Sequence, residues 1–227
     1  MTTLGILGAG KVGTTVARAA LAAGYDVRIA ASGPAAEIAL IVDVLTPGAD
    51  ADDAVGVVAA ADLVILATPL RKFRGLDPEL LAGKPVLDAM NHWVDNDGAL
   101  AELDEHPSSS EMVAAHLSKT LLGKSLNHIG YHELEEDGLP AGAPGRRALA
   151  VASDHPKTRE LASELIERLG FDAVDAGSLA AGRALEPATP IFVAAHEAPA
   201  LRRLLVEAGF PPPGTPAEPA SPASVAA

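Results

Sequence analysis

An α/β fold with a doubly wound, mostly parallel sheet is what this 227-residue sequence predicts, on two observations. Short apolar runs alternate along the chain with longer segments of helical period, which is the pattern of successive β-α-β units. The first apolar run, residues 4–7, passes directly into a glycine-rich turn and then into a helix-like segment. Together these features indicate a Rossmann-type fold, completed by a small C-terminal α/β extension.

The individual strands and helices can be predicted from the short apolar runs and from the segments of helical period. The run 63–67 is entirely apolar, as expected of a central parallel strand that is buried on both faces. The segment 157–169 carries its leucine and isoleucine residues on one face, and Gly170 follows as a suitable C-terminal cap. The expected strands are 4–7, 27–30, 63–67, 85–87, 120–126, 148–152 and 171–174, and the expected helices are 12–23, 35–45, 52–60, 111–117 and 157–169. The segment 178–195 is expected to be mostly helical, with breaks at its prolines.

Composition excludes several classes of partner. The net charge of −13 repels the phosphate backbone of nucleic acids and offers no basic patch to an anionic membrane. The sequence contains no cysteine, so neither a disulfide nor a thiolate nucleophile is available. We find no export signal and no apolar stretch of membrane-spanning length, and we therefore expect a cytoplasmic protein.

The glycine-rich turn has the spacing of a dinucleotide-binding motif. Its six residues, Gly8, Ala9, Gly10, Lys11, Val12 and Gly13, read G-x-G-x-x-G between a strand and a helix. In this motif the first glycine permits a tight turn, the second lets the backbone approach a pyrophosphate, and the third lets the helix pack closely on the strand. The helix N-terminus then presents free N–H groups to the anion. We therefore expect the turn to bind a nicotinamide dinucleotide.

The residues after the second strand favour NADP over NAD. An acid that would bind the ribose 2′-hydroxyl of NAD is expected there, but the sequence reads Ala30-Ala31-Ser32-Gly33. Asp26 lies at the other end of that strand, and Ser32 could donate a hydrogen bond to a 2′-phosphate. Arg71 and Lys72, after the third apolar strand, are the substitute cations, although they could equally be solvated loop charges.

Three parts of the chain are expected. Residues 1–126 form the dinucleotide-binding domain, and residues 127–210 form a smaller C-terminal part packed on it, on the acceptor side. Residues 211–227 are rich in proline and alanine and have no periodic apolar face, so we expect a disordered tail. The polar connection 91–110 is of a length that usually carries function or is mobile.

The chain resembles the NADP-dependent oxidoreductases of the deazaflavin coenzyme F-420, a family whose dinucleotide-binding domain is shared with transmembrane ferric reductases. The resemblance runs from Leu4 to about Phe192. The elements that carry it are the glycine turn, Ala67-Thr68-Pro69-Leu70, Asp88-Ala89-Met90-Asn91, Lys124-Ser125-Leu126-Asn127, and the run from Asp175-Ala176-Gly177 to Arg183-Ala184-Leu185-Glu186-Pro187. The family commonly has an arginine beside the serine after the second strand, and this chain has Gly33 and Pro34 there instead.

The resemblance implies a hydride transfer between NADP(H) and a small redox acceptor, either F-420 or a flavin. Such a transfer needs no nucleophile and no metal, because the cofactors carry the chemistry and the protein positions two rings. We accordingly assign no catalytic side chain and no metal site. Ala67, Thr68 and Pro69 would line the nicotinamide side of the cofactor, and Asn127, with His128 and Ile129, would approach the nicotinamide or the second ring. Asn91 is a weaker candidate, and Asn127 could instead be a strand-end cap.

Other polar residues have plainer interpretations. His128 and His132 are four residues apart, a metal-like spacing if they share a helix, but two histidines on a surface helix need no ligand. His92 could contact a substrate or belong to a packed aromatic corner with Trp93. Arg183 and Glu186 have the spacing of an intrahelical ion pair, with a subunit contact as the alternative.

Two other functions remain open beside transfer to F-420. One is an NADPH-dependent flavin, quinone or ferric reductase, because the acceptor pocket is the least recognisable part of the sequence. The other is a non-catalytic NADP-binding sensor, because the fold alone does not fix a function. The resemblance also leads us to expect a homodimer, in which the segment 178–195 buries apolar surface.

Overall fold

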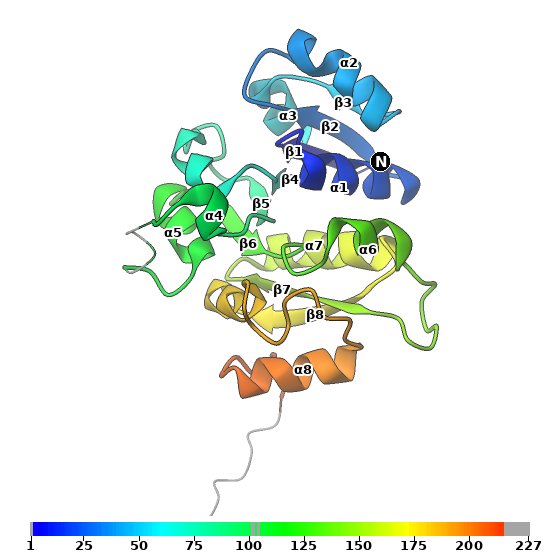
Figure 1. The fold of residues 1–227 in the computed structure, drawn as a ribbon, viewed down its shortest axis with the longest axis vertical. Coiled ribbons are helices and arrows are strands. Elements are labelled where there is room, and N and C mark those ends of the chain that lie inside the picture. The colour runs from blue at the N-terminus through cyan, green and yellow to red at the C-terminus, as the bar shows by residue number, and fades with distance from the viewer. Residues whose placement is uncertain (1, 101–102, 104, 216–227) are drawn as a thin grey trace, which may run out of the picture.

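A single sheet runs through the computed structural model, which describes residues 2–100, 103 and 105–215. Within those residues, eight strands form the sheet in the order β3-β2-β1-β4-β5-β6-β7-β8. Neighbouring strands are parallel except β6 and β7, which pair in antiparallel fashion at Gly123 with Ser153 and Lys124 with Ala152. The predicted α/β fold with a mostly parallel sheet is thereby confirmed (Figure 1).

In the first half of the chain, strands are added first on one side of β1 (Thr3–Leu7) and then on its other side. The chain passes through α1 (Lys11–Ala22), β2 (Asp26–Ala30), α2 (Ala35–Leu45), the short β3 (Asp50–Ala51) and α3 (Ala54–Ala60). It returns on the other side of β1 with β4 (Leu63–Leu66), the 3-10 helix η1 (Leu70–Gly75) and β5 (Pro85–Asp88). Because β1 pairs with both β2 and β4, the strand order reverses beside β1, and a crevice is expected at the carboxyl ends of these strands.

The second half continues the sheet and adds the C-terminal extension. Its elements are α4 (Val94–Asp97), α5 (Ser109–His116), β6 (Leu121–Lys124), α6 (Tyr131–Glu136), β7 (Ala148–Ser153), α7 (Pro156–Arg168), β8 (Asp172–Gly177), the 3-10 helix η3 (Leu179–Leu185) and α8 (Ala198–Glu207). The expectation of a mostly helical segment 178–195 was wrong, because only η3 forms there and turns follow it. The sequence analysis missed α8, although Leu201 and Leu205 have helical spacing and are buried.

Helices cover both faces of the sheet, as the doubly wound arrangement requires. On one face α1 and α7 bury Val16, Ala20, Leu165 and Ile166 against the central strands. A second core beside the sheet holds side chains of α3, η1 and α5, namely Val57, Val58, Leu70, Phe73, Met112 and Val113. A third core joins β7 and β8 to η3 and α8. This packing fixes the carboxyl ends of β1, β4, β5 and β6, where the candidate site lies.

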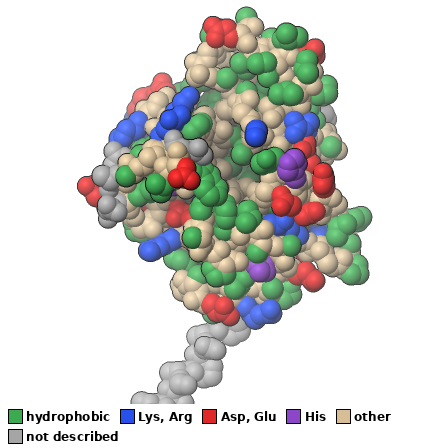
Figure 2. Space-filling view, viewed as in Figure 1, with side chains coloured by type: hydrophobic (Ala, Val, Ile, Leu, Met, Phe, Trp, Pro, Cys, Tyr) green, Lys and Arg blue, Asp and Glu red, His purple; other side chains and the backbone are tan. Residues whose placement is uncertain are grey.

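Two further features concern the surface and the C-terminus. Helix α2 exposes Leu40 and Val44, which are 75% and 67% accessible, and hydrophobic side chains are spread over the upper end of the molecule in Figure 2. Of the segment 211–227, residues 211–215 contain a turn in which the Thr215 N–H donates to the Pro212 carbonyl, and residues 216–227 lie outside the described residues. None of the helices in the described part of the chain is both long and apolar enough to cross a membrane.

Candidate functional site

The geometry of the turn between β1 and α1 requires glycine at Gly8 and Gly13 but not at Gly10. Gly8 has a φ of +127°, and a Cβ on it would lie 2.4 Å from the Ala67 carbonyl oxygen. A Cβ on Gly13 would lie 1.7 Å from the Gly8 carbonyl oxygen, so that only glycine lets α1 pack this closely on the strand. A Cβ on Gly10 would meet nothing within 4 Å. Gly10 thus faces open space, and the protein itself does not require a glycine there.

The N-terminus of α1 is suited to an anion. Gly10 is its N-cap residue, no side chain caps the helix, and no acidic residue lies in its first turn. The first N–H groups of a helix have no intrahelical acceptor and carry a partial positive charge. The open space at Gly10 and the uncapped helix therefore fit the pyrophosphate of a dinucleotide, as expected from the motif.

A cleft of about 790 Å³, here called the first cleft, opens beside this turn. It brings together the carboxyl ends of β1, β2 and β4 with η1, the first two turns of α2 and the first residue of α3. The sequence-predicted residues that line it are Gly8, Ala9, Gly10, Ser32, Ala67, Thr68 and Pro69, together with Lys72. The apolar part of its wall is formed by Ile38, Ile41, Ala54 and Leu76. An apolar cleft with a few polar groups at its ends is a typical site for a small-molecule cofactor.

Six residues of the predicted cofactor site lie outside the lining of this cleft, namely Lys11, Val12, Gly13 and Arg71, and also Asn91 and Asn127, which are described below. Lys11 lies over the ring of Tyr131, 5.9 Å from its centre, and Val12 is 39% accessible on the outer side of α1. Gly13 is buried beneath the turn. The backbone N–H of Arg71 donates to an oxygen of Asp97 at 3.4 Å, and Arg71, unlike its neighbour Lys72, does not line the cleft.

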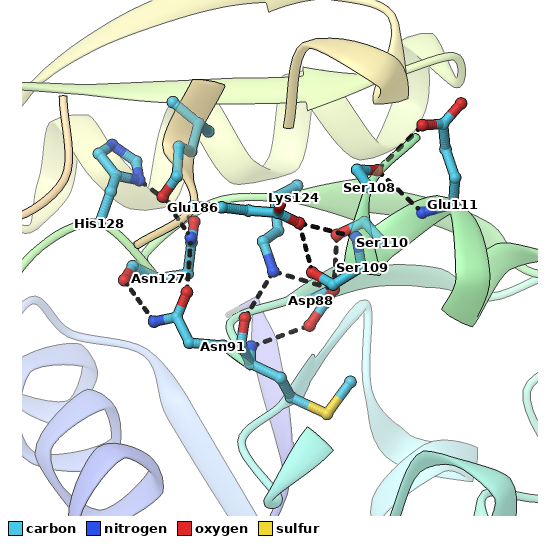
Figure 3. A network of polar contacts seen from close by, with 12 residues as sticks. Asp88, Asn91, Ser108, Ser109, Ser110, Glu111, Lys124, Asn127, His128 and Glu186 are labelled. Carbon is cyan, nitrogen blue, oxygen red and sulfur yellow. Dashed lines mark hydrogen bonds and ion pairs between the residues drawn. The ribbon is translucent and has the colours of Figure 1, made fainter. Parts of the chain in front are cut away.

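Asn91 and Asn127 come together beyond the ends of β5 and β6. The Asn91 side chain donates to the Asn127 carbonyl at 2.8 Å, and the Asn127 side chain donates to Asn91 Oδ1 at 3.0 Å and to the Leu185 carbonyl at 2.7 Å (Figure 3). Both amide hydrogens of Asn127 are therefore used inside the protein, and Asn127 is only 4% accessible. Asn91 is half-buried and keeps one N–H available. Asn127 therefore holds Asn91 in place, and Asn91 is the better placed to contact a ligand.

Beneath these amides lies a buried ion pair that the sequence analysis did not predict. Lys124 Nζ lies 3.2 Å from Asp88 Oδ2, and neither side chain is accessible to solvent. Lys124 also donates to the Met90 carbonyl at 2.5 Å, and Asp88 accepts from the Met90 N–H at 2.8 Å and from Ser110 Oγ at 2.6 Å (Figure 3). The pair therefore holds both backbone polar groups of Met90, which precedes Asn91. Thr68 Oγ1, from the first cleft, lies 3.4 Å from Met90 Sδ.

The loop after η3 is tied to the same network. The Glu186 carboxylate accepts from Ser109 N–H at 2.7 Å and from Ser109 Oγ at 2.6 Å, so it occupies the N-terminus of α5. The expected intrahelical pair between Arg183 and Glu186 was therefore wrong, because Glu186 follows the end of η3 and turns to α5. Arg183 instead lines a second cleft of about 620 Å³, together with His92, His106 and Ser109. His92 also lies 2.9 Å from the Gly98 carbonyl, and Trp93 packs edge-on against Phe192.

His128 has a structural position. It is 2% accessible, its Nε2 accepts from the Ala150 N–H at 3.0 Å, and its Nδ1 faces Asn127 Oδ1 at 3.3 Å. Burial, with the charges of Arg147 and Lys124 as smaller contributions, lowers the pKa of His128 to about 3. His128 lies in the loop before α6 and His132 lies on α6, so the two do not share a helical face. Within the described residues, no three histidine or acidic side chains converge as metal ligands would.

Comparison with known proteins extends these observations. Residues 3–92 match the model of the family described as NADP oxidoreductase, coenzyme F-420-dependent. The protein YjhV of Escherichia coli (strain K12) is 36% identical over 85 residues, which are 37% of this chain and 61% of YjhV. The match thus spans less than two thirds of that relative.

Two solved structures resemble nearly the whole chain. The hypothetical protein SMa0349 of Sinorhizobium meliloti is 28% identical with a TM-score of 0.75, covering 87% of this chain and 96% of its own. A candidate F-420-dependent NADP reductase of Arthrobacter sp. FB24 is 24% identical with a TM-score of 0.68, covering 92% and 96%. At this identity the second likeness shows the fold. The segment 3–92, which contains the glycine turn and lines the first cleft, thus matches the coenzyme F-420-dependent NADP oxidoreductase family, in agreement with the resemblance drawn from the sequence.

Proposed function

We propose that the chain is an NADP-dependent oxidoreductase that transfers a hydride between NADP(H) and a deazaflavin such as coenzyme F-420, or a flavin-like acceptor. The observation that carries the proposal is the turn at Gly10, which is open, uncapped and placed where the strand order reverses. The family match of residues 3–92 supports NADP as the dinucleotide. The acceptor remains the part of the proposal that rests on the family description.

The residues of this chain have positioning roles in such a reaction. NADPH, when bound, supplies the hydride, and the protein needs no nucleophile. The N-terminus of α1 would hold the pyrophosphate, and the apolar wall of Ile38 and Ile41 would cover the adenosine. Thr68, Pro69 and Asn91 follow β4 and β5 and would hold the nicotinamide against the acceptor. Asn127 and the Lys124–Asp88 pair fix Asn91, so they are positioning residues.

The second cleft supports an acceptor site beside this arrangement. The residues that line it include His92, which follows Asn91 in the chain. They also include Ser109 and Glu186, which hydrogen-bond to each other. An acceptor ring placed here would lie next to the residues that we assign to the nicotinamide. Burial of the two rings between the clefts would keep water from the transferred hydride.

Absorbance measurements on the purified protein test this proposal. NADPH is mixed with oxidised F-420, with FMN, and with no acceptor, and the loss of NADPH is followed together with bleaching of the acceptor. Rapid bleaching of F-420 or FMN is the expected result. Tight NADPH binding without turnover on any flavin, deazaflavin, quinone or ferric chelate would refute the enzymatic proposal and favour the sensor.

A Gly10→Ala variant tests whether NADPH binds at the glycine turn. Its Cβ would enter open space, so we expect folding stability within about 0.5 kcal/mol of the wild type. The same methyl group stands where the pyrophosphate must approach the backbone, and we expect the Kd for NADPH to rise at least about tenfold, which is about 1.4 kcal/mol. An unchanged Kd would place the dinucleotide elsewhere. Thermal unfolding of both proteins is the control.

A further inference from the structure

The first cleft contains one charged side chain among the residues that line it, and that side chain is Lys72. Lys72 lies on η1, the 3-10 helix that lines the cleft together with the loop after β2. Within the described residues its ammonium group forms no ion pair and no hydrogen bond, and Phe73, the next residue, anchors η1 in the core. In a chain of net charge −13, this cation gives the cleft a positive group that suits an anionic part of a ligand.

The part of the cleft lining that follows β2 contains a hydroxyl group and has a carboxylate nearby. Ser32 lines the cleft. Glu37, in the first turn of α2, folds back onto the loop, and a Cβ on Gly33 would lie 2.6 Å from Glu37 Oε2. The loop after the second strand is where this fold meets the adenine ribose, and an acid there accepts hydrogen bonds from a 2′-hydroxyl. Glu37 was absent from the sequence analysis, because it lies beyond the end of the strand and reaches the loop only by folding back.

We propose that Lys72 is the residue that recognises the 2′-phosphate of NADP, and that Glu37, beside the loop after β2, disfavours the same phosphate. This inference rests on the proposed function, since it names the residues that select the dinucleotide. Lys72 takes the place of a cation in the loop after β2, which here reads Ser32-Gly33-Pro34. Arg71 has no part in the selection, because it lies outside the lining of the cleft.

The two charges predict a moderate preference for NADP. Lys72 is an exposed cation on a flexible stem, and attraction between exposed groups is reduced by solvent and salt. Glu37 repels a 2′-phosphate and can accept from the 2′-hydroxyl of NAD. We therefore expect NADPH to bind more tightly than NADH, by about tenfold at low salt, and we expect the ratio to fall as salt is added.

Equilibrium binding to the full chain tests the inference with two matched pairs of ligands. NADPH and NADH differ in the 2′-phosphate, and adenosine 2′,5′-bisphosphate and adenosine 5′-monophosphate differ in the same group without a nicotinamide. For Lys72→Gln we expect the Kd of NADPH and of the bisphosphate to rise about tenfold, while the Kd of NADH and of the monophosphate changes less than about twofold. For Glu37→Gln we expect tighter NADPH binding, by about threefold, and unchanged or weaker NADH binding.

The matched control is Arg71→Gln, which removes the same charge from the neighbouring residue and should leave each Kd within about twofold. The inference is overturned if Lys72→Gln weakens both members of a pair equally, because Lys72 would then contact the pyrophosphate. It is also overturned if Arg71→Gln has the larger effect on NADPH. Wild-type protein that binds neither dinucleotide would refute the proposed function, whereas a failure to find a redox acceptor would leave these binding results intact.

Discussion

The turn at the end of β1 and the network at the ends of β5 and β6 form their parts of the site in different ways. The turn consists of backbone, and a side chain at its key position, Gly10, would contact no other part of the protein. The network consists of side chains from separate strands, and its centre, the pair of Lys124 and Asp88, is excluded from solvent. A change at the turn should therefore alter binding more than folding, and a change in the network should alter folding first.

The turn and the network also contribute differently to ligand binding, because the turn provides affinity for the dinucleotide and the network positions the nicotinamide. Backbone N–H groups at a helix N-terminus bind any phosphate of suitable shape, so the turn supplies affinity for dinucleotides in general. Selection of the phosphate pattern belongs to side chains such as Lys72, and placement of the nicotinamide belongs to Asn91. Leu126, which precedes Asn127, has a φ of +61° and is buried, a strained conformation that the surrounding packing maintains. Strain and buried charge thus both occur at the network and not at the turn.

The largest effect is expected when the buried ion pair is broken. Lys124→Met leaves the Asp88 carboxylate buried without its cation, and we expect the free energy of unfolding to fall by about 3–5 kcal/mol. The stem of Lys124 packs 3.1 Å from the position of a Cβ on Gly182, so methionine retains most of the packing. Denaturant unfolding followed by circular dichroism measures the change.

The double variant Lys124→Met with Asp88→Asn is the control for that experiment. It removes both charges, so it should lose less stability than the sum of the two single changes. If the double variant folds while NADPH turnover stays low, the pair is needed to hold Met90 and Asn91. A loss below about 1 kcal/mol for Lys124→Met would contradict a strong buried pair.

A smaller effect is expected from the pH dependence of His128. Burial holds its pKa at about 3 in the folded protein, whereas the unfolded chain has an ordinary value near 6.5. The unfolded state therefore binds a proton first as pH falls, and stability is complete above pH 6.5 and decreases toward pH 3. Between pH 6.5 and 5 we expect the free energy of unfolding to fall by about 2 kcal/mol.

His128→Gln tests the assignment. Its side chain can still accept from the Ala150 N–H but has no titratable group, so the slope of stability against pH in this interval should decrease. Unfolding at several pH values, compared between the two proteins, gives the slope. Identical slopes would show that another group titrates.

Much of the fold could be predicted because its signals are local. The apolar runs 4–7 and 63–67 are strands buried on both faces, and Gly8 and Gly13 occupy positions whose backbone geometry only glycine satisfies. Asp50–Ala51 was missed because a strand of two residues has no period. Helix α8 had a signal in Leu201 and Leu205, with a proline in its first turn, but the prolines before it concealed its start.

The network could not be predicted, because its contacts join residues far apart in the chain. Lys124 and Asp88 are 36 positions apart, and they meet only because β5 and β6 pair in parallel and end at the same edge. A charged residue at the end of each of two apolar strands was the one available signal. Glu186 was likewise read with its sequence neighbour Arg183, whereas its partner Ser109 lies 77 positions away.

The smallest effect is expected where the two halves of the chain meet at the surface, at the pair of Arg18 on α1 and Glu135 on α6. Arg18 Nε lies 2.5 Å and Nη2 3.0 Å from the two Glu135 oxygens, and the side chains are 36% and 29% accessible. The hydrogen bond from Arg18 lowers the pKa of Glu135. Because solvent screens such a pair, we expect Glu135→Gln to cost only about 0.5–1 kcal/mol at pH 7.

The sign of the pH dependence distinguishes this pair from the buried network. Since the pKa of Glu135 is lower in the folded protein, the stabilisation is present above the usual pKa of glutamate and is lost as pH falls through the folded value. The stability difference between the wild type and Glu135→Gln should therefore decrease as pH falls below the usual pKa of glutamate, and it should shrink in high salt. Glu79→Gln, which removes the more exposed pair with Lys119, is the matched control and should change stability less. A difference that persists at acid pH would show that Glu135 joins α6 to α1 by packing and not by charge.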